Sequence, residues 1–162
     1  MLRVVVTVTL AVALVAVTLP ALETARRDRS DQRVTAELDR LAAAIEDVYA
    51  REAAVSPEAS GAQRVVTVRL PTRSWTDAEV EYVAIGAHPE HTGVDERNET
   101  TFGWQVSGAR PRTRRLADVP VEAATPSGSD SPLVIREPGR HRLALSLVDR
   151  DGQRTVVVRR VD

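Results

Sequence analysis

The feature that most constrains this chain is an uncharged apolar run close to its N-terminus. Val4–Leu22 holds 19 consecutive residues without a charged side chain. As an α-helix, such a run is about 28 Å long, close to the ~30 Å hydrocarbon core of a bilayer. Pro20 falls near its far end, where a kink is tolerable because other groups can satisfy the freed carbonyl. We therefore expect residues 1–22 to form a transmembrane anchor.

A cleaved signal peptide is the main alternative to a retained anchor, and a buried helix of a soluble protein is a third. Signal peptides have apolar regions of roughly 7–15 residues that end in a small-x-small cleavage site. Cleavage after Ala21 would place Leu19 three residues before the cut, and cleavage after Ala25 would place Glu23 there. Both sites are poor and the run is long, so the sequence favours the anchor.

Two features bear on the orientation of this anchor, and they disagree. Arg3 precedes the apolar run, whereas four arginines follow it within residues 26–33. The positive-inside rule alone therefore favours a cytoplasmic C-terminal side. Asn98-Glu99-Thr100, however, is an N-glycosylation sequon, and Asn98 is a candidate glycosylation site of an external domain. We predict that the C-terminal domain lies outside the cytoplasm.

An amphipathic helical stalk is predicted over residues 23–54, where the apolar side chains form a heptad stripe. The spacing between stripe residues alternates between four and three. The stripe consists of Val34, Leu38, Leu41, Ile45 and Val48. Two interpretations remain open: the stripe packs on the chain's own downstream domain, or it mediates self-association. Together with the anchor, the stalk predicts a nearly continuous rod about 80 Å long.

The apolar period changes from 3.6 to 2 after residues 55–62, a linker rich in small residues. In residues 63–162 the alternation predicts seven strands, at 64–70, 79–85, 101–107, 114–121, 133–136, 141–149 and 154–161. Arg150-Asp151-Gly152 is typical of a hairpin turn, and Pro120 indicates an edge strand. The predicted fold class is α+β: a long N-terminal transmembrane and amphipathic helix, followed by an antiparallel β domain that is sandwich-like or a highly twisted sheet.

The aromatic residues add one expectation about the core of this domain. Phe102 and Trp104 lie two residues apart in one predicted strand, so they share a face of it. Both are expected to be buried.

Composition and motifs exclude several chemistries. The chain contains no cysteine and no lysine, which excludes disulfides, thiolate nucleophiles, Schiff bases and P-loops. A net charge near −1 argues against a nucleic-acid binder. The sequence contains no nucleophile elbow, HExxH motif or glycine-rich phosphate loop. We therefore predict a protein that is not an enzyme and that has no cofactor, no bound metal and no nucleic-acid partner.

Three polar clusters have ligand-like residues, and each has a simpler interpretation. The histidines and acids of His88–Glu99 would ligate a metal only from a helix, and a proline and a glycine within the cluster favour a solvated loop instead. Asp77, Glu79 and Glu81 alternate as the exposed polar face of a strand would. The four arginines of residues 110–115 are interpreted as a solvated basic loop.

The order of these parts resembles that of type IV pilin-like and pseudopilin-like proteins, in which a hydrophobic helix runs into an amphipathic half and then an antiparallel β domain. The corresponding parts here are Val4–Leu22, Asp31–Ala54 and Arg64–Val161. The resemblance implies a pilin-like sheet and an assembly role. It would also imply a leader peptide and a glutamate near the start of the mature helix, whereas three residues precede the run and position 5 is Val5. The lysine-free, arginine-rich composition is similar to that of small uncharacterised membrane-anchored proteins of haloarchaea.

These patterns together predict a non-enzymatic, single-pass protein of the cell membrane whose extracytoplasmic β domain has a structural or assembly role. Its partners would be the lipid bilayer and either further copies of the chain or other membrane or pilus-like subunits. The alternative is a membrane-tethered binding module that uses the loop at residues 86–100.

Overall fold

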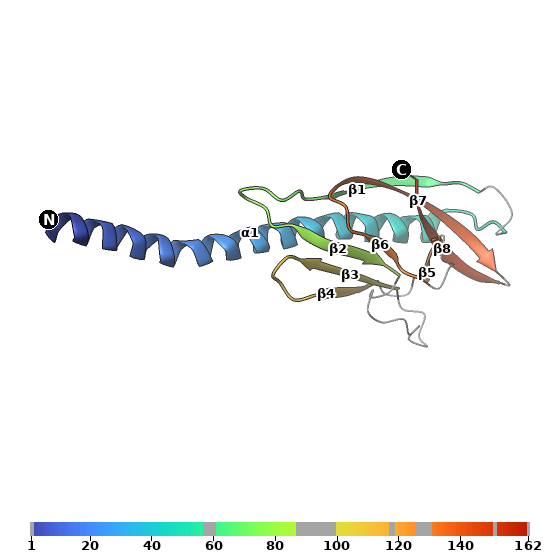
Figure 1. Cartoon of the computed structure of the whole chain (residues 1–162). Helices are drawn as coiled ribbons and strands as arrows, with labels where there is room; N and C mark the ends of the chain where they lie inside the picture. The colour runs from blue at the N-terminus through green and yellow to red at the C-terminus, as the bar shows by residue number, and fades with distance from the viewer. Residues whose placement is uncertain are drawn as a thin grey trace.

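The structure, a computed structural model of the whole chain, describes residues 2–56, 61–86, 100–116, 119–125, 131–150 and 152–161. These residues form one long helix and two four-stranded sheets (Figure 1). The N-terminal half of the helix projects away from the sheets, and the C-terminal half runs alongside them. This is the α+β architecture that the sequence predicts. We call the two sheets together the β domain.

Helix α1 spans Leu2–Arg51 without interruption, so the predicted anchor and stalk form one rod. Pro20 lies inside the helix, and the Thr24 hydroxyl donates to its carbonyl at 3.0 Å. This bond pairs the Thr24 hydroxyl within the helix itself. The N-terminal part of α1 is long and apolar enough to cross a membrane, and none of that segment is buried against the rest of the chain. The helix ends at Arg51 rather than at the predicted Ala54.

The β domain contains eight described strands, most of them close to their predicted positions. They are β1 (Arg64–Leu70), β2 (Val80–Ile85), β3 (Thr100–Val106), β4 (Arg112–Leu116), β5 (Val121–Ala123), β6 (Leu133–Ile135), β7 (Gly139–Arg150) and β8 (Gln153–Arg160). The strand order is β1-β7-β8-β5 in the first sheet and β4-β3-β2-β6 in the second.

One predicted strand is wrong, because residues 114–121 do not form a single element. The structure has β4 up to Leu116 and β5 from Val121, and the two strands belong to different sheets. Pro120 directly precedes β5 and cannot donate a backbone hydrogen bond, so it separates the two segments. β5 is an edge strand, as Pro120 indicates. It pairs with β8 in parallel, whereas the other pairs of described strands are antiparallel.

The predicted hairpin between the last two strands is confirmed. β7 and β8 pair in antiparallel fashion from Leu143↔Arg160 to Arg150↔Gln153. Gly152 has a φ of +86°, a conformation that residues with a Cβ rarely adopt. Its amide donates to the Asp149 carboxylate at 2.8 Å, which closes the turn.

The hydrophobic core lies where α1 meets the inner faces of both sheets. Phe102 and Trp104 of β3 are buried there, as the sequence predicts, together with leucines of β7 and valines of β8. All of them join one continuous cluster with the apolar stripe of α1. The C-terminal half of α1 therefore contributes to the packed core of the β domain.

Candidate functional site

The apolar stripe of α1 is the first predicted site, and it packs inside the chain. Its five members are at most 1% exposed: Val34, Leu38, Leu41, Ile45 and Val48. They contact residues of both sheets in the core cluster. Of the two interpretations of the stripe, the structure therefore shows packing on the chain's own domain. Self-association through these residues stays a prediction, and their apolar surface is covered by the β domain.

One flank of the stripe is joined to β1, the edge strand of the first sheet. The Glu37 carboxylate accepts a hydrogen bond from the backbone amide of Arg69 at 3.2 Å. Asp47 forms ion pairs with Arg64 of β1 and, at 3.0 Å, with Arg51 one turn along the helix. These contacts fix α1 along this edge.

The other flank of the stripe is joined to the second sheet. Asp31 forms an ion pair with Arg112 of β4 at 2.7 Å and accepts a hydrogen bond from Nε1 of Trp104 at 3.0 Å. Asp39 forms a further ion pair with Arg114. The basic run predicted as a solvated loop is therefore wrong in its C-terminal part, which is strand β4 and supplies arginines to the acids of α1. The local sequence around these arginines does not indicate their acidic partners, because those acids lie about 80 residues earlier in the chain.

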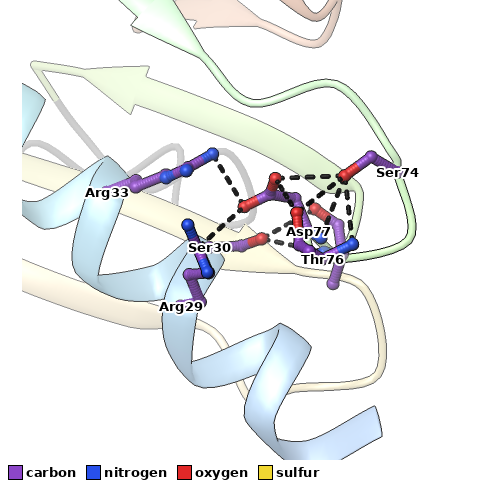
Figure 2. A network of polar contacts seen from close by, with 7 residues as sticks. Arg29, Ser30, Arg33, Ser74, Thr76 and Asp77 are labelled. Atoms are coloured by element: carbon purple, nitrogen blue, oxygen red, sulfur yellow. Dashed lines mark hydrogen bonds and ion pairs between the residues drawn. The ribbon is translucent and has the colours of Figure 1, made fainter. Parts of the chain in front are cut away.

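The most connected polar group among the described residues is the carboxylate of Asp77 (Figure 2). It is 6% exposed and lies in the connection between β1 and β2, against α1. Its Oδ1 is paired with Arg33 at 2.8 Å and lies 3.9 Å from Nε of Arg29. Its Oδ2 accepts hydrogen bonds from the hydroxyls of Ser74 at 3.1 Å and Thr76 at 3.0 Å. The interpretation of Asp77 as an exposed strand residue is therefore wrong.

Ser30 is the helix partner of the same connection, and it is completely buried. Its hydroxyl donates to the carbonyl of Ala78 at 3.0 Å and accepts from the amide of Ala78 at 2.8 Å. Both backbone groups of a loop residue are thus satisfied by one helical side chain. Together with Asp77, this contact fixes the β1–β2 connection to α1 at two points; we call it the Ser30–Asp77 clamp.

The electrostatics of the clamp favour a charged carboxylate. Burial by itself would raise the pKa of Asp77, because a carboxylate loses hydration inside the protein. The hydroxyl hydrogen bonds from Thr76 and Ser74, with the positive charges of Arg33 and Arg29, outweigh burial and hold the pKa of Asp77 below its ordinary value. Asp77 is therefore an anion at neutral pH. Its oxygens are engaged with the fold, which is the environment of a structural carboxylate rather than of a general acid or base.

Sequence reasoning misses this clamp, although part of its signal is local. Ser74-Trp75-Thr76-Asp77 follows Pro71, and its small polar residues are typical of side chain–backbone hydrogen bonds in a turn. The amides of Thr76 and Asp77 do donate to the Ser74 hydroxyl, at 3.2 and 3.1 Å. The arginines and the serine of α1 that complete the clamp are more than 40 residues away, and no local pattern indicates them.

The other predicted site residues lie outside the described part of the chain. Asn98 and the ligand-like cluster His88–Glu99 belong there, as does nearly all of the proposed binding loop at 86–100. Within the described ranges there is no group of three or more acids and histidines placed to hold a metal ion.

The arrangement defines an α+β protein in which one helix has an exposed apolar half and a half enclosed by two sheets. The chain belongs to the family described as a domain of unknown function, DUF7311, which matches residues 1–161. The match covers helix and β domain together, so the two form one unit of that family. The chain matches no curated protein and no solved structure.

Proposed function

We propose that this chain is a single-pass membrane protein in which α1 crosses the bilayer and carries the β domain rigidly on its far side. The observation that carries the proposal is the change of environment along one continuous helix. Residues such as Leu10 and Leu14 are about two-thirds exposed, whereas Leu38 and Ile45, on the same helix, are completely enclosed. An exposed apolar surface of this extent is stable in lipid and not in water.

The backbone of the apolar half is suited to hydrocarbon. An uninterrupted helix satisfies its own amides and carbonyls, which lipid cannot do; the exception is the carbonyl of Ala16, because Pro20 has no N–H to donate to it. The hydroxyls of Thr7 and Thr9 donate to the carbonyls of Arg3 and Val5, at 2.9 and 2.8 Å. The threonines therefore leave no unpaired donor facing lipid.

The proposed role is structural, with no catalysis and no cofactor, in a pilin-like or envelope assembly. The shape of a long helix whose second half underlies a β domain supports the comparison with pilin-like proteins. Because the stripe of α1 is enclosed by its own domain, the apolar half is the surface through which copies would associate. The sequon at Asn98 supports a location outside the cytoplasm.

Membrane insertion and topology are tested together in cells. We expect the chain to stay in the membrane fraction after alkaline extraction. Its mass, measured by mass spectrometry, should show that the N-terminal peptide has not been cleaved. Protease added to intact cells should digest the β domain. Release of a soluble chain that begins near residue 22 would identify a cleaved signal instead, and a protected β domain in intact cells would reverse the proposed orientation.

Assembly through the apolar half is tested by cysteine cross-linking, which is clean here because the chain has no cysteine of its own. Ala11→Cys, Val12→Cys and Val17→Cys place single thiols on three sides of the helix. Oxidation in native membranes should give a covalent dimer at one of these positions and not at the others. Leu38→Cys is the matched control, because the β domain encloses that position. Equal or absent cross-linking at all three positions would contradict specific assembly.

A further inference from the structure

Trp75 is the most exposed large apolar side chain of the described β domain, at 87%. It lies at the centre of the β1–β2 connection, between two residues whose side chains bond Asp77. The loop around it is held by the Ser30–Asp77 clamp, so its backbone is fixed to α1. A large indole held in the open by its own loop is available to a partner that suits both its apolar ring and its polar N–H.

The position of this loop along α1 places it close to the bilayer. Ser30, to which the loop is bonded, lies about 12 Å along the helix axis from Leu22, the last residue of the apolar run. The β3–β4 turn lies nearer still: an atom in the Cβ position of Gly108 would be 3.0 Å from Nε of Arg27, which is only about 8 Å past Leu22. Figure 1 shows both connections reaching from the β domain towards the apolar half of α1.

The shorter of these distances matches the thickness of the polar layer of a membrane, and the longer one ends a few ångströms beyond it. The headgroup region adds about 5–8 Å to each side of the hydrocarbon core. With Leu22 at the edge of that core, the β3–β4 turn meets the headgroups, and a tryptophan side chain on the neighbouring connection has the reach to enter them. Tryptophan is enriched at this depth because its ring is apolar and its N–H is polar.

Charge at this end of the domain suits an anionic surface. Arg73 precedes Trp75 by two residues, and Arg110 lies in the β3–β4 turn; both are exposed. Arg26, Arg27 and Arg29 lie at the same level of α1, together with the exposed acids Glu23 and Asp28. Arg27 is paired with Glu23 and Arg29 lies 3.9 Å from Asp77, so the exposed Arg73 and Arg110 are the cations that this end of the domain offers to an anionic surface. Basic residues near a bilayer gain attraction from anionic headgroups, and arginine binds phosphate through several donors.

We propose that the β1–β2 connection and the β3–β4 turn form a membrane-docking surface for anionic phospholipid, with Trp75 in the headgroup layer and Arg73 and Arg110 on lipid phosphates. The inference rests on the proposed function, because α1 must first cross the bilayer. Docking gives the rod a second attachment beside its anchor. It fixes the tilt and rotation of the β domain relative to the membrane.

The test uses tryptophan fluorescence of the full chain in vesicles of phosphatidylcholine and phosphatidylglycerol. The chain has two tryptophans, and Trp104 is buried with its N–H bonded to Asp31, so the Trp75→Ser variant measures the background. We expect lipids brominated near the headgroup to quench Trp75, and aqueous iodide to quench it severalfold less than in detergent. The Arg73→Glu/Arg110→Glu variant should lose this protection while the chain still floats with the vesicles.

Three other results would overturn the proposal. If the chain floats with vesicles but Trp75 is quenched by iodide and not by lipid, the docking surface is wrong and the anchor stands. If Trp75 is shielded from both quenchers, a protein contact, such as a second copy, covers it instead. If the chain does not float at all, the membrane anchor fails and the docking surface fails with it.

Discussion

The two halves of α1 have the same secondary structure and opposite surroundings. Residues 4–22 are apolar on every side and exposed on every side. Residues 31–51 have one apolar stripe, and acids on its two flanks bind the two sheets. A helix that is apolar all round requires an apolar medium, whereas a striped helix requires one packed face. The difference shows that the distribution of apolar residues around the helix, more than their number, decides whether the chain's own domain can cover them.

The largest expected effect comes from the enclosed half. Leu38→Ala removes buried side-chain volume from the core, so we expect the free energy of unfolding of the β domain to fall by about 2–5 kcal/mol. The measurement is a denaturant titration of the full chain in detergent. Leu10→Ala is the matched control on the exposed half, and it should leave this free energy unchanged. Equal effects of the two substitutions would show that the halves are not distinct.

A charge at the centre of the exposed half should prevent membrane insertion of that half. Leu14→Arg places a guanidinium near the middle of the apolar run, which costs about 3 kcal/mol of insertion free energy. We expect a clear drop in the membrane-inserted fraction of the chain after alkaline extraction. Ala43→Arg, on the exposed side of the C-terminal half, is the control and should insert normally. Normal insertion of the Leu14→Arg chain would exclude a span centred on this residue.

The Ser30–Asp77 clamp gives a smaller effect that depends on pH. Because the pKa of Asp77 is lowered in the fold, its stabilising contribution is present above the ordinary aspartate value near 3.8 and is lost as the pH falls through the folded pKa. We expect Asp77→Asn to lower the free energy of unfolding by about 1–2 kcal/mol at neutral pH and by progressively less below pH ~4. Unfolding titrations at several pH values measure this. Glu81→Gln, an exposed acid on β2, should show neither effect.

The smallest effect concerns the acids on the flanks of the stripe. In a double-mutant cycle, Asp31→Ala and Arg112→Ala should show a coupling energy of about 0.2–1 kcal/mol, because their ion pair is partly exposed. The single Asp31→Ala change should cost more than Arg112→Ala, since it also leaves the Trp104 N–H without its acceptor. Equal single effects would show that the Trp104 bond contributes little.

Much of the fold follows from local patterns in the sequence. The helix, the β7–β8 hairpin and most strands are indicated by periodicity and turn residues, which act between neighbours in the chain. The predictions from local patterns fail where the position of a residue depends on a partner far away in the sequence. The segment 114–121 has the alternation of one strand, but Leu116 and Val121 enter different sheets. The alternating pattern around Asp77 predicts an exposed acid. In the fold Asp77 is buried, and Arg33 and two hydroxyls compensate its charge.

By itself, the sequence determined that this protein has an apolar rod at its N-terminus, a striped continuation and a β-rich remainder. Those properties depend on the period of side chains along a helix or a strand, which each segment sets alone. The tertiary structure decided that the stripe is enclosed by two sheets, that β5 runs parallel to β8, and that Ser30 and Asp77 fix a tryptophan loop to α1. These outcomes depend on burial and charge pairing between residues far apart in the chain, and only the assembled fold brings those residues together.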